Sequence, residues 1–182
     1  MTAQGFALFD SPIGPCGIAW NAKGIAGFHL PLATAQATRT RLQQRWAGAV
    51  ESAPPPGVQR VIERVLALLN GEAIDLTDIP VDLADAPEFH RKVYEVARTI
   101  PPGKTMTYGE IAKRLGAPHE SREVGQALGR NPIAIIVPCH RVLGADGKMG
   151  GFSASGGVAT KRRILEIEGA AALSAGPLFE QR

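Results

Sequence analysis

Cysteine is scarce in this sequence, with only Cys16 and Cys139 among 182 residues. The two thiols lie far apart and belong to no Cys-x-x-Cys pair, so the sequence encodes neither a zinc ribbon nor a disulfide framework. His29, His90 and His119 share no metal-ligand spacing with each other or with Cys16. We therefore expect no metal site, no cofactor and a reducing compartment.

Long apolar runs are also missing. No stretch approaches the roughly 20 apolar residues that a helix needs to cross a bilayer, and the start MTAQGFALFDSPIG lacks the basic and then apolar order of a signal peptide. No long apolar seam is present that could bind a second chain. These absences predict a cytoplasmic monomer with no membrane contact and no obligate protein partner.

The excess of one charge is small but uneven. The apolar fraction of 45% is ample for a buried core, and the formal net charge is +3. Residues 1–100 hold 9 basic and 10 acidic side chains, whereas residues 101–182 hold 11 and 7. A positive field over the second half weakly favours a polyanionic partner.

The first part of the chain has the pattern of a small sheet with helices. Residues 6–30 are typical of short antiparallel strands, with a turn at 21–24. Residues 33–47 are compatible with a helix, and the proline-rich segment 52–57 is expected to be a stiff connector. Apolar residues then recur at helical spacing over 58–69, before Asn70-Gly71 ends the helix.

The second part is mainly helical. Asp85 to Glu88 has the form of a capping box, and a helix follows over 89–100 until Pro101-Pro102-Gly103 ends it. We place a boundary near residue 84. The prediction is an α+β chain with a small N-terminal sheet-plus-helix domain, 1–84, and a mainly helical C-terminal domain, 85–182.

A pair of short helices follows in the layout of a helix-turn-helix. Thr107 to Glu110 is a second capping box, and its helix ends at Gly116. The next helix is expected over Ser121–Leu128, with Arg122 in its first turn pointing at DNA and Gly125 allowing close backbone approach. Short helix pairs are common packing units, and the carboxylates of Glu120 and Glu123 would be repelled by phosphates.

The run from Asn131 to Val142 is the most informative part of the sequence. An apolar stretch leads through Pro138 into Cys139, with His140 and Arg141 directly behind. The thiolate is the reactive form of cysteine, and a nearby positive charge or base lowers the thiol pKa. Cys139 is therefore predicted to be a nucleophile, whereas Cys16 has no charged neighbour and is expected to pack in the core.

At PCHRV, residues 138–142, the sequence resembles the O6-alkylguanine-DNA alkyltransferases, also called methylated-DNA–protein-cysteine methyltransferases. The similarity covers about the last hundred residues in the order and spacing of that family, from the helix that starts at Phe89 to the final Glu168-Gly169. It includes the motifs GKTMTYGEIA, SREVGQALGRNP, IIVPCHRV and GADGKMGGFSASGG. The first 84 residues match only in general layout.

The resemblance implies a reaction and its residues. Cys139 would accept the alkyl group, His140 would draw the thiol proton through a bridging water, and Glu168 would orient the imidazole. Asn131 would tie the turn beneath the site to the helix pair. Tyr108 would crowd the target phosphate, help rotate the nucleotide and donate a proton to the leaving guanine.

The partner implied is double-stranded DNA that contains alkylated guanine, with O4-alkylthymine as a second candidate lesion. Arg122 would fill the gap left in the base stack by the flipped nucleotide. Phe152 and Ser153 would lie near the guanine. The loop GGFSASGG is two residues longer than in many members, so Ser155 competes with Ser153 for the serine role. The effect of Glu123 on DNA affinity, the range of alkyl groups and any cooperativity stay open.

Three other functions compete with irreversible DNA repair by alkyl transfer. A helix-turn-helix module that senses damage without catalysis would not need the thiol. A cysteine hydrolase using Cys139 and His140 would turn over many times, because its product leaves the sulfur. A redox-sensing thiol needs a resolving partner, and Cys16 is a poor candidate for that role.

Overall fold

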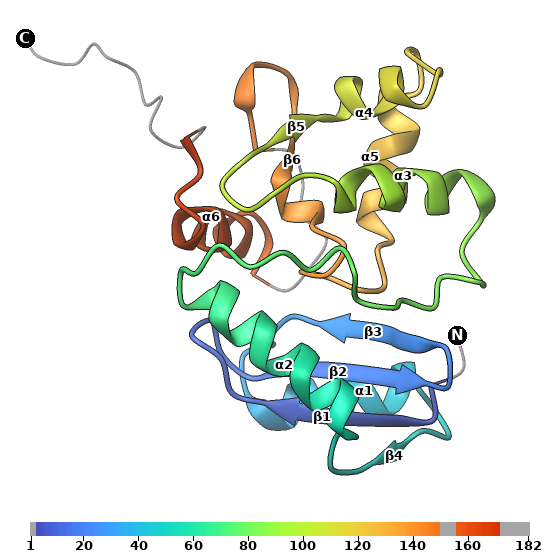
Figure 1. The fold of residues 1–182 in the computed structure, drawn as a ribbon, viewed down its shortest axis with the longest axis vertical. Coiled ribbons are helices and arrows are strands. Elements are labelled where there is room, and N and C mark those ends of the chain that lie inside the picture. Colours follow the sequence, from blue (N-terminus) through green and yellow to red (C-terminus); the bar gives the residue numbers. More distant parts are fainter. Residues whose placement is uncertain (1–2, 150–155, 172–182) are drawn as a thin grey trace, which may run out of the picture.

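The N-terminal sheet and the C-terminal helices lie side by side and share one core (Figure 1). The computed structural model describes residues 3–149 and 156–171. No helix in these two ranges has both the length and the apolar character needed to span a membrane. The predicted α+β class, with the sheet first and the helices after it, is confirmed.

The sheet has four strands in the order β3-β2-β1-β4. The pairs β1·β2 and β2·β3 are antiparallel, as predicted, and the backbone N–H of Lys23 donates to Asn21 Oδ1 in the turn between β2 and β3. The fourth strand pairs parallel to β1 and was not predicted, because two residues carry no alternating pattern. The strands are β1 (Gly5–Phe9), β2 (Cys16–Asn21), β3 (Gly24–His29) and β4 (Val50–Glu51).

The two faces of the sheet are covered by different helices. Helix α1 (Ala35–Arg45) and the residue after it place Leu42 and Trp46 against Phe6 and Ala19 on one face. The other face contributes to the main core, which also contains the apolar side of α2 (Pro56–Leu69). The approach of α1 is close: a Cβ at Gly27 would lie 1.9 Å from Trp46 Cζ2. Only glycine fits there.

The start of α2 and the capping residue of α3 differ from the prediction. The stiff connector is shorter than expected, since α2 already begins at Pro56. Proline is tolerated at the first helical position because its N–H would have no partner there. The capping box at Asp85 is not formed: α3 (Glu88–Arg98) has Pro87 at its N-cap position and no side-chain capping bond. The extended backbone of Pro87, with φ −52° and ψ 149°, makes Glu88 the first helical residue, one residue before the predicted start at 89.

The predicted helix pair is confirmed. Helices α4 (Tyr108–Arg114) and α5 (Ser121–Gly129) pack against each other and against α3. Both halves of the second capping box are present: Glu110 N donates to Thr107 Oγ1 at 3.2 Å, and Thr107 N donates to Glu110 Oε2 at 2.6 Å. The buried hydroxyl of Tyr94 donates to the carbonyl of Ala127 at 2.8 Å and joins α3 to α5.

Short elements place the segment around Cys139 beside these helices. A 3₁₀ turn (Cys139–Arg141) leads into β6 (Val142–Leu143), which pairs parallel with β5 (Met106–Thr107) just before α4. A second 3₁₀ turn (Ala145–Gly147) follows β6, and α6 (Gly157–Ile167) packs against the first of these turns. The β5–β6 pair thereby brings the first residue of α4 close to Cys139.

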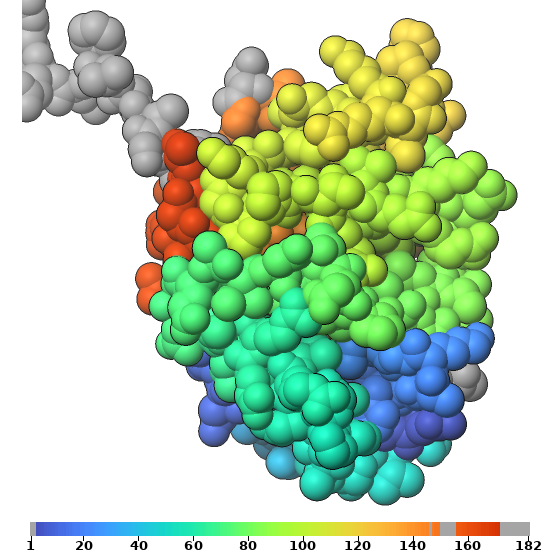
Figure 2. Space-filling view, viewed as in Figure 1, coloured from blue at the N-terminus to red at the C-terminus, as the bar shows by residue number. Residues whose placement is uncertain are grey.

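The two parts of the chain are joined directly. The main core contains buried side chains from both, and Phe28 N of β3 donates to the carbonyl of Pro132 at 3.0 Å. Figure 2 shows the segment after α2 covering the junction between the sheet and the helices on one face. The domain boundary near residue 84 stays a prediction about independent folding units.

Candidate active site

Two tight turns present Cys139. We name residues 133–139 the thiol turn. Ile136 N donates to the carbonyl of Ala134 at 2.9 Å around Ile135, whose φ of 69° makes this the rare form of γ-turn. Cys139 N donates to the carbonyl of Val137 at 2.8 Å around Pro138, whose φ of −82° and ψ of 65° give the common inverse form. Left-handed backbone at a β-branched residue is strained, and it occurs here four residues before the thiol.

Asn131 holds the thiol turn at both ends. Its Nδ2 donates to the carbonyl of Val137 at 2.8 Å, and its Oδ1 accepts from Ile133 N at 3.0 Å. Because Asn131 follows directly after α5 and its C-cap Arg130, these bonds connect the turn to the second helix of the pair. This is the geometry that the resemblance implied for Asn131.

Cys139 is buried, with 9% of its surface exposed. Burial raises the pKa of its thiol, because a charged thiolate loses hydration in the interior. The Asn131 side chain, the positive charge of Lys161 and nearby backbone N–H groups lower the pKa in the opposite direction. The thiolate is thus disfavoured by its surroundings as a whole and favoured by specific donors.

His140 and Glu168 are held together in the interior. His140 Nε2 lies 2.9 Å from Glu168 Oε1, and Arg141 donates to both oxygens of the same carboxylate at 3.0 and 2.8 Å. The side chains of His140 and Glu168 are 1% and 0% exposed. The resemblance predicted the pair formed by His140 and Glu168, and the structure brings the two side chains together.

The charges of this group fix where the imidazole proton resides. Burial tends to raise the pKa of Glu168, but its bonds to His140 and Arg141 outweigh burial and lower that pKa to about 2. Burial also lowers the pKa of His140, so the ring is neutral near pH 7. An ionised carboxylate only accepts hydrogen bonds, so the proton of the neutral ring is on Nε2. His140 Nδ1 is then the basic nitrogen, and it is buried with no hydrogen-bond partner in residues 3–149 or 156–171.

Arg141 does not act on the thiol as its position in the sequence suggested. Its side chain bonds Glu168 and donates to the carbonyl of Ile100 at 2.6 Å, and it is not among the groups that lower the thiol pKa. In a 3₁₀ turn, consecutive side chains point in different directions, so adjacency in sequence did not place the guanidinium next to the sulfur.

Lys161 supplies the cation instead, and the sequence analysis missed it. Its side chain is 1% exposed, its Nζ donates to the carbonyl of Val142, and it lies 5.9 Å from the ring centroid of Tyr108. Burial lowers the pKa of Lys161, while the charge of Cys139 raises it. A signal was available, because Lys161 shares a helical face with the buried Ile164 and Leu165.

Tyr108 and Gly125 lie together at the helix pair. Tyr108 begins α4 and is half-buried, and burial followed by the charge of Cys139 raises the pKa of its hydroxyl. A Cβ at Gly125 would stand 3.9 Å from the Tyr108 ring, so α5 passes close to that face of the tyrosine. Arg122 and Glu123 are exposed in the first turn of α5. Phe152, Ser153 and Ser155 lie outside the described residues.

The remaining polar candidates do not form a second site. No group of three or more histidine, cysteine or acidic side chains that could hold a metal ion occurs within the described ranges. Cys16 is fully buried, as expected, and burial raises the pKa of its thiol to about 12. A thiol with such a pKa is a poor nucleophile near neutral pH.

Known proteins are similar to this chain in sequence and in fold. Residues 88–170 match the family model described as 6-O-methylguanine DNA methyltransferase, DNA binding domain. That segment contains the helix pair, the thiol turn and Glu168, so these features define a DNA-binding domain of the 6-O-methylguanine DNA methyltransferase class. The methylated-DNA–protein-cysteine methyltransferase of Mycobacterium tuberculosis is 38% identical over 176 residues, covering 96% of this chain and 98% of the relative. The chain belongs to the methylated-DNA–protein-cysteine methyltransferase family.

A second relative and two solved structures agree. A relative from Methanosarcina acetivorans is 38% identical over 165 residues, covering 90% of this chain and 97% of its own. The structure of Mycobacterium tuberculosis OGT in complex with DNA is similar with a TM-score of 0.72 and 36% identity, covering 93% of this chain and 97% of that one. The structure of an O6-methylguanine-DNA methyltransferase from the archaeon Pyrococcus kodakaraensis is similar with a TM-score of 0.72 and 26% identity. The match covers 91% of this chain and 99% of that one.

Proposed function

We propose that this protein repairs DNA by moving an alkyl group from O6 of guanine onto Cys139 Sγ, once per molecule. The named activity of relatives that cover nearly the whole chain supports this reaction, as does the DNA complex of a similar structure. The observation that carries the proposal is a buried thiol next to His140, whose basic Nδ1 lacks a partner in the described parts of the chain while Glu168 holds its Nε2. We also propose that the protein acts as a cytoplasmic monomer.

The arrangement accounts for the chemical step. The thiol proton is relayed by water to His140 Nδ1, and the sulfur attacks the alkyl carbon in line with the bond to O6. The S–C bond forms as the C–O6 bond breaks, and the bonding electrons leave with guanine, which takes a proton from the hydroxyl of Tyr108. Glu168 stabilises the imidazolium that results. The product is a thioether with no acidic leaving group, so the sulfur is not regenerated.

Binding to DNA precedes that step. In this proposal α5 enters a groove of double-stranded DNA, Arg122 fills the space of the flipped nucleotide, and Gly125 lets the backbone approach. Tyr108 rotates the target nucleotide from its place at the start of α4. An O6-alkylated guanine pairs poorly, so flipping it costs less than flipping an intact base, and this difference contributes selectivity.

Intact-mass and peptide mass spectrometry tests the proposal. The full-length protein is mixed with a duplex that bears one O6-methylguanine, with wild type, Cys139→Ala and Cys16→Ala run in parallel. We expect wild type and Cys16→Ala to gain one methyl group on the peptide that contains Cys139, saturating at one per protein. Cys139→Ala should gain none and still bind the duplex.

Each rival function has its own signature in the same experiment. If the wild-type protein binds the duplex without a gain in mass, the function is damage sensing and the proposal fails. If lesions disappear in excess over protein and no mass is gained, Cys139 serves a turnover enzyme. If the gain appears equally in Cys139→Ala, another residue is the acceptor.

A further inference from the structure

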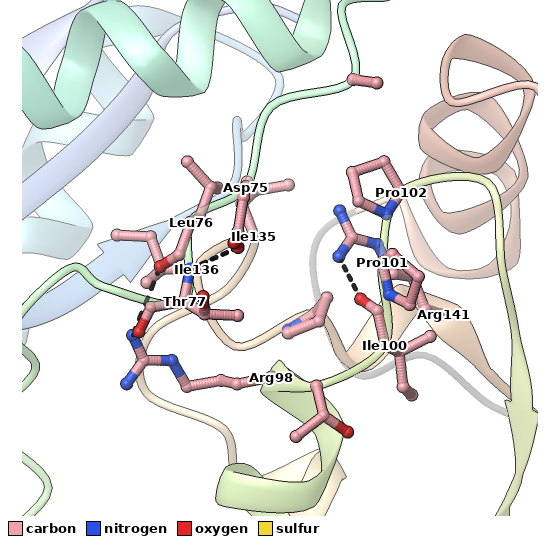
Figure 3. A pocket seen from close by; sticks show the side chains of 13 residues that line it. Asp75, Leu76, Thr77, Arg98, Ile100, Pro101, Pro102, Ile135, Ile136 and Arg141 are labelled. Carbon is pink, nitrogen blue, oxygen red and sulfur yellow. Dashed lines mark hydrogen bonds between the residues drawn. The ribbon is translucent and has the colours of Figure 1, made fainter.

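A cavity of about 330 Å³ lies against the thiol turn, apart from the group formed by Cys139, His140 and Tyr108. Its wall comes from the loop that follows α2, from the end of α3 with the prolines after it, and from the thiol turn itself. Figure 3 shows these three segments around the cavity. The volume is at the lower end of the range of about 300–1,000 Å³ that is usual for small-molecule sites.

Most of the wall is apolar. Leu76, Ile100, Ile135 and Ile136 line it, and each of these four side chains is otherwise buried in the protein. Pro101, Pro102 and Pro138 add rigid apolar surface. Such a surface binds the apolar body of a ligand, whereas orientation depends on the few polar groups in the wall.

The first of these polar groups is the guanidinium of Arg98, whose hydrogen bonds within the described residues all go to backbone carbonyls. Its NH2 group donates to the carbonyls of Leu76, Thr77 and Ile79 at 3.3, 2.7 and 2.7 Å. Arg98 forms no ion pair in residues 3–149 or 156–171, and its Nε there is buried without a partner. Burial lowers the pKa of Arg98, and the charges of Asp78 and Asp75 offset this only in part, so the guanidinium is incompletely compensated.

The second polar group is Arg141, which reaches the cavity from another side (Figure 3). Its Nε and both terminal nitrogens donate one bond each, to Glu168 and to the carbonyl of Ile100. A guanidinium has five N–H groups, so each terminal nitrogen keeps one further N–H that meets no acceptor in the described part of the chain. Arg141 is 5% exposed, so these donors face the interior or the cavity and not bulk water.

We propose that this cavity binds a small molecule with an apolar body and a single carboxylate, which pairs with Arg98 and accepts from Arg141. Charge complementarity favours an anion at Arg98, whose charge is incompletely compensated, whereas Arg141 is already paired with Glu168 and offers its remaining N–H donors. Asp75 is exposed in the same wall, and its negative charge disfavours ligands with several anionic groups. The expected class is therefore a short-chain monocarboxylic acid.

The ligand would contact the side of the thiol turn that faces the cavity. Ile135, Ile136 and Pro138 contribute to the wall, and Pro138 directly precedes Cys139. None of Cys139, His140, Glu168 and Tyr108 lines the cavity, although Arg141 connects its wall to Glu168 through two hydrogen bonds. Ligand binding can thus be tested on the protein without DNA, and its failure would leave the proposed repair function untouched.

Titration with hexanoate tests the proposal, with hexanamide as a probe of the same shape without charge. Calorimetry measures affinity, and methyl resonances of isoleucines report the place of binding. We expect saturable binding of hexanoate with shifts at Ile135, Ile136 and Ile100, and at least about tenfold weaker binding of hexanamide.

Variants locate the site. Ala73→Phe and Thr99→Phe each add a ring to a different segment of the wall, at residues that are themselves exposed. Both should weaken hexanoate binding at least about tenfold. Ala47→Phe, at an exposed residue after α1, is the matched control and should bind as wild type does. Absence of saturable binding, equal affinity for hexanamide, or full affinity in both wall variants would overturn the proposal.

Discussion

His140 Nε2 and Glu168 Oε1 lie 2.9 Å apart in a site where neither side chain is more than 1% exposed. The carboxylate is ionised there because His140 and Arg141 both bond to it and together lower its pKa. A buried charge of this kind depends on its partners, and losing one of them is strongly destabilising. Glu168, which orients the base His140, therefore also stabilises the fold.

The stability of the protein should fall in acid because of Glu168. Its pKa is lowered from 4.5 to about 2 in the folded state, so its contribution is fully present above pH 4.5 and is lost as the pH falls to about 2. The shift corresponds to a contribution on the order of 3 kcal/mol. Urea unfolding of wild type and Glu168→Gln between pH 7 and pH 3 should show a stability difference that shrinks with falling pH.

Glu166→Gln is the matched control for that prediction. Glu166 is exposed on the same helix, α6, and has no part in the buried group. Its variant should follow the wild-type profile throughout. A wild-type profile that stays flat from pH 5 to pH 3 would contradict the assigned charge of Glu168.

Replacing Lys161 should make the thiol less acidic. The Lys161 charge lowers the pKa of Cys139, so Lys161→Met should raise that pKa and slow thiolate reactions near pH 7. The readout is the pH profile of Cys139 labelling by iodoacetamide in a Cys16→Ala background. Arg162→Met removes the same charge from an exposed neighbour on α6 and should leave the profile in place.

The left-handed backbone at Ile135 gives a comparison of two small replacements. Ile135→Ala and Ile135→Gly both lose a buried side chain, at a cost of about 2–5 kcal/mol. An alanine at this position also has the energetic cost of left-handed backbone, about 1–2 kcal/mol, which a glycine does not have. Ile135→Gly should therefore be at least as stable as Ile135→Ala in urea unfolding. At the neighbouring Ile136, whose φ is not positive, the order should reverse.

Two glycine-to-alanine changes should have opposite effects. Gly27→Ala would place a methyl 1.9 Å from the Trp46 ring and should destabilise by about 1–3 kcal/mol. Gly57→Ala, in the first turn of α2, meets only the far end of Arg60 at 4.0 Å and should stabilise by about 0.4–1 kcal/mol. Thermal unfolding measures the change in stability of each variant relative to wild type. Equal losses would mean that α1 does not pack closely on the sheet.

Glu123 should weaken DNA binding through its charge. It is exposed beside Arg122 in the first turn of α5, where a carboxylate near phosphates is repelled. Glu123→Gln should strengthen binding to an undamaged duplex about two- to fivefold at low salt, and less at high salt. Fluorescence anisotropy measures the change, with Glu95→Gln, at an exposed position on α3, as control. Unchanged affinity would place Glu123 away from DNA.

Local signals in the sequence predicted the elements that depend on local chemistry. The Thr107 capping box, the helix that ends at Asn70 and the turn at Asn21 all rest on bonds between near neighbours. The pair formed by His140 and Glu168 was predicted only through the family resemblance, because 28 residues separate the two side chains and no periodicity connects them.

Features that depend on packing were not predicted. Strand β4 exists because β1 offers it a partner, and its two residues have no pattern of their own. The direction of Arg141 follows from the 3₁₀ turn, and the start of α2 and the N-cap of α3 follow from the backbone of Pro56 and Pro87. The charge of Lys161 was overlooked because a buried lysine is rare.

The bond from Phe28 N to the carbonyl of Pro132 joins positions separated by roughly one hundred residues. Contacts of such long range close late in folding, because the entropy of a large loop must be lost before they form. The thiol turn therefore receives this support only when β3 and the segment that follows α5 are both in place. An incomplete or nascent chain carries an ordinary cysteine, and the labelling rate of Cys139 thus reports how much of the population has reached the native state.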